Sequence, residues 1–217
     1  MTLKENLKQL QESLPKHVQL IAVSKTKPVA DIQTLYDAGN LDFGENRVQE
    51  LIEKQAVLPT DIRWHLIGNL QRNKVKYIAP YVHLIHSMES ERLLKEINKQ
   101  AKQNDRVISC LLQIRIAKEE TKFGLEKEEA ERILTTYKEL YSHVKIVGLM
   151  GMATFTDDED QIRNEFKELK SIYDSFKKHD ESLEILSMGM SGDYKIAIEE
   201  GSTMIRVGSL IFGERAV

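Results

Sequence analysis

Apolar and polar positions follow two different rhythms along this chain. Short apolar runs, typical of strands buried on both faces, alternate with stretches in which apolar residues recur at helical spacing. The predicted strands are Val18–Ser24, Leu41–Gly44, Arg63–Ile67, Val82–Ser87, Val107–Ile116, Val144–Met150, Leu183–Ser187 and Thr203–Val207. The predicted helices are Leu3–Leu14, Val29–Ala38, Arg47–Val57, Lys74–Ala79, Ser90–Gln103, Lys127–Leu140, Asp158–His179 and Asp193–Glu200.

The order of these elements predicts an α/β barrel. Strict alternation of strands and helices implies a parallel sheet, and eight repeats favour closure into a (β/α)8 TIM barrel. An open doubly wound sheet is the alternative. Only residues 208–217 follow the last predicted strand, so we expect the extra N-terminal helix to occupy the gap beside it. Because no Pro- or Gly-rich linker divides the chain, residues 1–217 are predicted to form a single domain.

The composition is ordinary for a globular protein, with 41% hydrophobic and 30% charged residues and a net charge of −3. This balance argues against a nucleic-acid or membrane partner. No segment resembles a signal peptide or approaches the roughly 18 apolar residues of a membrane helix. The one cysteine, Cys110, suits a reducing compartment, so a cytoplasmic location is predicted. Cys110 is expected to pack in the core rather than act as a nucleophile.

A lysine closes the first predicted strand. Lys25 would stand at the carboxyl ends of the barrel strands, where active sites lie. A lysine amine in water has a pKa of about 10.4, and burial or a second cation favours its neutral form. In an extended chain Lys27 would share a face with Lys25 and supply that cation. Such an amine forms a Schiff base with an aldehyde. A solvated lysine before the turn at Pro28 is the alternative.

Two further strand ends carry polar side chains. Asn46 follows the second predicted strand, where its amide could contact a ligand or cap the next helix. His65 alternates with Trp64, so one of the two should face the barrel interior. A histidine with its hydrogen bonds satisfied in the core is the alternative for His65.

Small and hydroxyl-bearing residues gather after the last two predicted strands. Ser191 and Gly192 follow the seventh strand, and Gly208 and Ser209 follow the eighth. Barrels frequently bind phosphate in these two loops, where small residues admit the backbone and hydroxyl and N–H groups donate. The four residues therefore predict a phosphate cradle. Two ordinary loops with a serine helix cap are the alternative.

An amine for an aldehyde and a phosphate cradle at one barrel mouth indicate pyridoxal 5′-phosphate (PLP) as the ligand. Alternation with Met204 could aim Arg206 inward, near the pyridine ring. A guanidinium stays protonated, so it would donate to the ring nitrogen and oppose its protonation, which weakens the ring as an electron sink. An arginine paired with a surface carboxylate is the alternative.

Five segments together resemble the pyridoxal phosphate homeostasis proteins, and the resemblance extends over essentially the whole chain. The segments are Ala22–Pro28, Phe43–Asn46, His65–Lys74, Ser187–Ser191 and Gly201–Gly213. The resemblance implies the barrel of the alanine racemase N-terminal domain type.

The same resemblance implies a set of PLP-binding residues. Lys25 would carry the cofactor and Arg206 would meet the ring nitrogen. The complete implied set is Lys25, Asn46, His65, Ser191, Arg206, Gly208 and Ser209. Two positions depart from the family pattern: Leu66 replaces a phenylalanine, and Arg115 replaces an asparagine. No role is assigned to Arg115.

The resemblance implies a carrier that holds PLP and delivers it to PLP-dependent apo-enzymes, without turnover. The alternative is a PLP-dependent racemase or decarboxylase. Racemisation needs two opposed bases, and alanine racemase draws one from a second domain that a chain ending at Val217 is expected to lack. A monomer is therefore expected. A nucleic-acid or protein adaptor using the basic segment Gln71–Lys76 is a third hypothesis, weakened because a short basic helix is commonly a solvated face.

Overall fold

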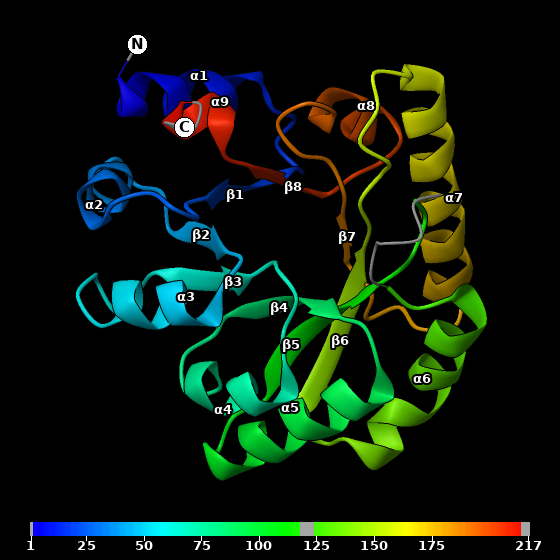
Figure 1. Cartoon of the computed structure of the whole chain (residues 1–217). Helices are drawn as coiled ribbons and strands as arrows, with labels where there is room; N and C mark the ends of the chain where they lie inside the picture. Colours follow the sequence, from blue (N-terminus) through cyan, green and yellow to red (C-terminus); the bar gives the residue numbers. More distant parts are fainter. Residues whose placement is uncertain (1, 118–123, 214–217) are drawn as a thin grey trace.

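The predicted strands form one closed parallel barrel. The computed structural model describes residues 2–117 and 124–213 (Figure 1). The strands are β1 (Gln19–Val23), β2 (Asp42–Glu45), β3 (Arg63–Leu66), β4 (Leu84–Met88), β5 (Ile108–Gln113), β6 (Val144–Met150), β7 (Ile185–Ser187) and β8 (Met204–Val207). Each strand pairs with the next, and β8 pairs with β1. The barrel prediction is confirmed, and the open-sheet alternative is wrong.

Helices surround the barrel on its outside (Figure 1). They are α1 (Leu3–Ser13), α2 (Val29–Asp37), α3 (Val48–Gln55), the 3-10 helix η1 (Arg72–Lys74), α4 (Val75–Ile78), α5 (Glu91–Gln103), α6 (Lys127–Leu140), α7 (Glu159–Lys177), α8 (Tyr194–Glu199) and α9 (Ser209–Phe212). Local capping explains where some begin: Thr2 and Glu5 form a capping box on α1, and Ser90 Oγ accepts from the Leu93 N–H at the start of α5.

The apolar core has two layers. A small inner cluster lies inside the barrel and includes Ile21, Leu111 and Met204. A larger outer cluster, with Phe43 and Trp64 among its largest side chains, packs the strands against the helices. The interior of the barrel is therefore packed, as in other barrels of this size. No helix among residues 2–117 and 124–213 is long and apolar enough to cross a bilayer.

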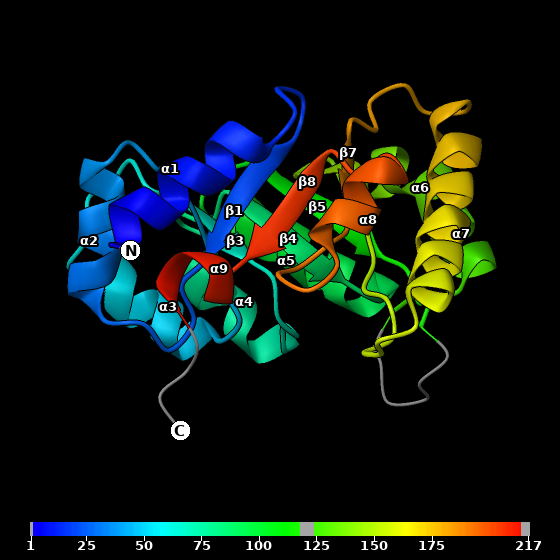
Figure 2. The same cartoon turned by 90° about the horizontal axis from the view of Figure 1, so that it is seen from above.

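The N-terminal helix lies beside the first and last barrel repeats, as expected. It packs against α2 and α9, and Asn6 Nδ2 donates to the Ile211 carbonyl at 3.0 Å. Figure 2 shows α1 and α9 side by side, although they are the first and last described helices in the sequence. The sequence did not predict α9, because four residues are too few to show a helical period.

Candidate functional site

Lys25 lies in a tight turn directly after β1. The strand ends at Val23, and the Lys27 N–H donates to the Ser24 carbonyl at 3.0 Å. Thr26 has a φ of +65°, a left-handed conformation that is uncommon for a β-branched residue. The extended alternation therefore stops before Lys25, and the expectation that Lys27 shares its face is wrong. Lys25 itself is half-buried.

A buried ion cluster fixes this turn from behind. Lys54 on α3 donates from Nζ to Glu45 Oε1 at 2.8 Å, to the Ser24 carbonyl at 2.8 Å and to Glu50 Oε1 at 2.6 Å. Ser24 Oγ also donates to Glu45 Oε1, at 2.6 Å. The Thr26 N–H donates to Glu50 Oε1. The residues on either side of Lys25 are thus held by charge-assisted hydrogen bonds, the strongest type available.

Lys27 is engaged elsewhere. Its Nζ donates to the carbonyl oxygens of Phe212 at 3.2 Å and Gly213 at 3.3 Å, at the carboxyl end of α9. A cation in this position satisfies carbonyl groups that a helix end leaves unpaired. Lys27 therefore ties the Lys25 turn to the last helix of the barrel.

The loops after β7 and β8 meet each other. The Gly208 N–H donates to Ser191 Oγ at 3.2 Å. Asp193, not Ser191, occupies the N-cap position of α8, and its Oδ1 accepts from the Met190 N–H. The serine-cap alternative is therefore wrong for Ser191. Ser209 is exposed at the first position of α9.

These loops also adjoin the end of β1. A Cβ added to Gly208 would lie 3.2 Å from the Val23 carbonyl oxygen, two residues before Lys25. A Cβ added to Gly192 would meet no atom within 4 Å, so space is open there. The lysine turn and the two hydroxyl-bearing loops therefore share one end of the barrel, as the sequence predicts.

Arg206 points into the barrel rather than to the surface. In β8, Arg206 pairs with Ile21 of the inner cluster. Arg206 is 4% exposed. Its Nη1 donates to Ser187 Oγ at 2.6 Å and its Nη2 to the Gly151 carbonyl at 3.2 Å. Burial lowers the pKa of Arg206 to about 10, with Asp193 acting in the opposite direction, so it stays cationic near neutral pH. The alternative of a surface ion pair is wrong.

His65 is fully buried and both of its ring nitrogens are engaged. Nε2 lies 3.0 Å from Asp42 Oδ1, and Nδ1 lies 2.9 Å from His86 Nε2. Burial lowers the pKa of His65, although Asp42 acts to raise it. His65 is therefore a core histidine with satisfied hydrogen bonds, which leaves it an indirect role at the site.

Asn46 lies at the exit of β2 and is partly exposed. The N-cap position of α3 belongs to Arg47, so Asn46 is not the helix cap that the sequence left open. The backbone of Asn46 lies close to the exit of β3, because a Cβ added to Gly68 would lie 2.3 Å from the Asn46 carbonyl oxygen. Only a residue without a Cβ at position 68 therefore permits Asn46 to lie this close.

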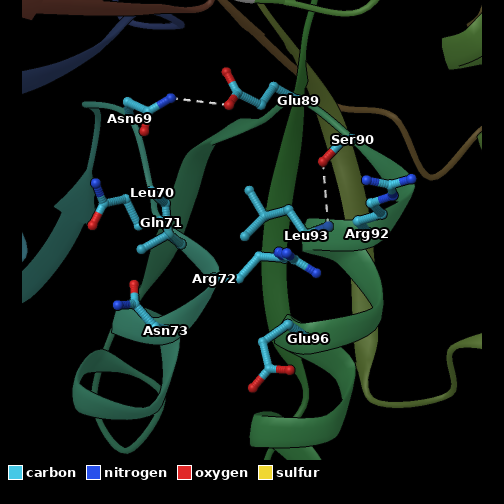
Figure 3. Close-up of a pocket in the computed structure, with 10 residues that line it drawn as sticks. All are labelled: Asn69, Leu70, Gln71, Arg72, Asn73, Glu89, Ser90, Arg92, Leu93 and Glu96. Atoms are coloured by element: carbon cyan, nitrogen blue, oxygen red, sulfur yellow. Dashed lines mark hydrogen bonds between the residues drawn. The ribbon is translucent and has the colours of Figure 1, made fainter.

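A hollow of about 730 Å³ opens beside this end of the barrel, between the exits of β3 and β4 (Figure 3). The basic segment that begins at Gln71 forms one wall, and the start of α5 forms the other. Arg72 and Arg92 face the hollow together with Glu89 and Glu96. This mixed charge differs from the uniformly basic surface that nucleic-acid binding requires.

Two residues that the sequence left without a site role have structural explanations. Cys110 is fully buried, and burial raises the pKa of its thiol strongly, as expected for core packing. Arg115 forms an ion pair with Glu126.

Sequence reasoning missed three residues that support the site. They are Lys54, His86 and Ser187, which contact Glu45, His65 and Arg206 respectively. The spacing of Glu50 and Lys54 at i,i+4 was visible. The contacts of Lys54 with Glu45, of His86 with His65 and of Ser187 with Arg206 join different elements, so they appear only when the barrel brings those elements together.

The comparisons with known proteins agree with this geometry. The family model described as "Alanine racemase, N-terminal domain" matches residues 1–216. An alanine racemase from Clostridium difficile has the same fold, with a TM-score of 0.80 at 15% identity, over 100% of this chain and 57% of that protein. The fold and the site thus define a barrel of the alanine racemase N-terminal domain class.

Closer relatives narrow the class. The pyridoxal phosphate homeostasis protein of Aquifex aeolicus is 41% identical over 91% of this chain and 87% of its own length. The structure of PipY from Synechococcus elongatus without PLP is similar with a TM-score of 0.93, at 36% identity over 98% of this chain and 100% of PipY. A PipY structure with PLP bound has a TM-score of 0.89. This chain belongs to the family of pyridoxal phosphate homeostasis proteins.

Proposed function

We propose that this chain binds PLP at the carboxyl end of its barrel and carries it as a Schiff base on Lys25. The observation that supports this most strongly is the hydrogen bond from Gly208 to Ser191, which joins the two hydroxyl-bearing loops beside the end of β1. PipY, solved with PLP bound, has the same fold at 36% identity. Lys25 and the two loops supply the donor set that PLP requires: one amine for the aldehyde and several hydroxyl and N–H groups for the phosphate.

The phosphate is assigned to Ser191, Gly208 and Ser209. Ser191, in the loop after β7, and Ser209, at the start of α9, both bear a hydroxyl group and are at least partly exposed. The open space at Gly192 leaves room for an anion beside them. A phosphate that accepts from these hydroxyl and backbone groups is held without a neighbouring lysine, so Lys25 is left for the aldehyde.

Lys25 and Arg206 would hold the ring of the cofactor. Arg206 remains a cation and acts as a donor, so it opposes protonation of the pyridine nitrogen. Asn46 is the polar side chain at the neighbouring strand exit, and His65 supports the ring region from within the barrel. With an arginine as ring partner, the bound cofactor is a poor electron sink, which favours storage over catalysis.

Lys25 would hold the cofactor through its side-chain amine, because an amine condenses with an aldehyde and releases one water. Since water reverses that condensation, the same linkage would also allow release. The buried cluster around Lys54 keeps the backbone of the turn fixed in both states.

The names of the relatives support an inference about the biological role. The Aquifex and Pasteurella relatives are both named pyridoxal phosphate homeostasis proteins. We infer that this chain buffers PLP and passes it to PLP-dependent apo-enzymes, as a monomeric, cytoplasmic, single-domain carrier without turnover.

The experiment is a visible spectrum of the purified chain with PLP, before and after borohydride reduction. Wild type is expected to show the absorbance of a Schiff base. Reduction should leave the cofactor covalently attached to Lys25, and this attached group is the label to be mapped. Lys25→Ala should abolish both, whereas Lys8→Ala on the exposed face of α1 should change neither. A spectrum unchanged by Lys25→Ala contradicts the proposal.

Turnover is tested separately. The PLP-loaded chain is incubated with a panel of amino acids, and racemised or decarboxylated products are measured. We expect no product beyond one equivalent per chain. Sustained conversion that is lost in Lys25→Ala would identify the chain as a PLP enzyme and refute the carrier role.

A further inference from the structure

A line of buried polar side chains crosses the barrel interior below the proposed ring site. Arg206 Nη1 donates to Ser187 Oγ at 2.6 Å, and Ser187 Oγ lies 3.3 Å from His86 Nδ1. His86 Nε2 lies 2.9 Å from His65 Nδ1, and His65 Nε2 lies 3.0 Å from Asp42 Oδ1. The line therefore links the cation at β8 to a carboxylate at the opposite end of the barrel.

The far end of the line is anchored by an ion pair. Arg63 donates from Nε and Nη2 to the two carboxylate oxygens of Asp42, at 2.7 and 2.5 Å. Burial acts to raise the pKa of Asp42, but hydrogen bonds from His65 and Arg63 outweigh it and hold that pKa well below its usual range. Asp42 is thus an anion, and an ionised carboxylate only accepts hydrogen bonds.

The anion fixes the direction of every bond in the line. His65 must donate from Nε2 to Asp42, which leaves Nδ1 of a neutral ring as an acceptor. His86 then donates from Nε2 to His65, which leaves its own Nδ1 to accept from Ser187. Burial lowers the pKa of both rings, with His65, Arg206 and His83 acting in the same direction on His86, so both stay neutral.

One consequence concerns Ser187. Because its only hydrogen is directed at His86, its oxygen faces Arg206 as a pure acceptor. The two histidines and the serine are all fully buried, where a polar group without a partner is costly. Neutral hydrogen-bonded groups thus occupy interior positions that apolar residues such as Ile21 and Leu111 fill elsewhere in the barrel.

We propose that His86, oriented by His65 and Asp42, is a positioning residue that holds Ser187 as an acceptor and thereby aims Arg206 at the ring of the bound ligand. This inference rests on the proposed function, in which Arg206 meets the pyridine nitrogen. The line of hydrogen bonds transmits no reaction; it fixes the orientation of one guanidinium.

The first test uses the chain without PLP. Nitrogen NMR of the histidine rings at neutral pH should show His65 and His86 neutral, each with its proton on Nε2. Ser187→Ala should shift the Nδ1 signal of His86, because that atom loses its donor. A proton on Nδ1 of either ring, or a His86 signal unaffected by Ser187→Ala, overturns the proposal.

The second test adds PLP. Ser187→Ala should weaken PLP affinity about ten- to hundredfold, the range for loss of one hydrogen bond made by a charged group, and should shift the visible absorbance of the bound cofactor. Ser187→Thr, which keeps the hydroxyl, should restore both. Ser87→Ala is the matched control, since Ser87 is fully buried on the same strand as His86 but donates to the Gly68 carbonyl.

The outcomes separate the two claims. If wild type binds PLP and Ser187→Ala matches Ser87→Ala in affinity and spectrum, the positioning role is wrong while the proposed function stands. If wild type binds no PLP, the proposed function fails, and the inference about Arg206 falls with it even where the NMR of the rings agrees.

Discussion

Lys54 Nζ lies 2.8 Å from Glu45 Oε1 in a pair whose side chains are 6% and 0% exposed. Among the residues that the structure describes, Glu45 Oε2 has no hydrogen-bond partner. Burial raises the pKa of Glu45, and the hydrogen bonds from Lys54 and Ser24 act against that effect. Lys54 therefore stabilises the ionised form of the buried Glu45 carboxylate behind the Lys25 turn.

Lys54→Met should destabilise the fold by about 3–5 kcal/mol, because it leaves Glu45 buried without its cation. Urea unfolding followed by circular dichroism measures this. Replacing both partners, in Lys54→Met with Glu45→Leu, should recover most of the loss, since no uncompensated charge remains. Equal destabilisation in the single and double variants would contradict this account of the cluster.

Stability should fall as the pH is lowered from about 6.5, because His65 and His86 are held neutral by burial. The unfolded chain binds protons on these residues near pH 6.5, whereas the folded chain binds them only at lower pH. The folded state thus loses up to about 1.4 kcal/mol per pH unit for each histidine in this window.

The measurement is urea unfolding between pH 5 and 7.5, a range chosen around the reference pKa of about 6.5. His86→Gln should make the dependence on pH shallower. His179→Gln, at an exposed position just past α7, is the control and should leave the slope unchanged. A His86→Gln slope identical to wild type would mean that His86 binds protons in the folded chain as readily as in the unfolded chain, which contradicts its burial as a neutral ring.

Gly68→Ala should disturb the site through Asn46. The added Cβ would lie 2.3 Å from the Asn46 carbonyl oxygen, so the two strand exits must separate. We expect a loss of about 1–3 kcal/mol of stability together with weaker PLP binding. Gly192→Ala, whose Cβ would meet no atom within 4 Å, should keep wild-type stability. Thermal unfolding of the two variants measures the difference in stability. Equal stability of Gly68→Ala and Gly192→Ala would contradict the prediction.

Lys27→Met should weaken PLP binding without moving the point of attachment. It removes the hydrogen bonds to the Phe212 and Gly213 carbonyls and so loosens α9, which carries Ser209. The expected loss of affinity is about two- to tenfold, while borohydride should still label Lys25. Lys4→Met, on the exposed face of α1, is the control. A label found on Lys27 in wild type would show that Lys27 itself is an attachment point.

The barrel could be predicted from sequence because its strands and helices differ clearly in period. Helix α6, for example, has the predicted bounds, and β1 is one residue shorter at each end than Val18–Ser24. Lys25, Ser191 and Gly208 could be placed near one another because parallel strands bring their carboxyl ends to one face.

The supporting contacts could not be predicted in the same way. Lys27 was placed beside Lys25 by assuming an extended chain, but Thr26 turns left-handed and sends the Lys27 amine to Phe212. His65 is a candidate ligand on the sequence alone, because nothing there shows that its Nδ1 is engaged. In the structure that atom contacts His86, which lies on another strand, 21 positions away. Such pairs depend on strand register, which periodicity alone does not give.

The pairing of β1 with β8 sets Ile21 opposite Arg206, so two strands that are far apart in the sequence must meet before the barrel closes. During synthesis, residues 1–207 leave the ribosome before Gly208 and Ser209, to which the phosphate is assigned. A nascent chain that stops before Gly208 can therefore display Lys25 yet lack these two residues. On the proposed assignment, the vitamin is retained only after β8 has closed the barrel, so ligand retention would serve as an assay of that closure.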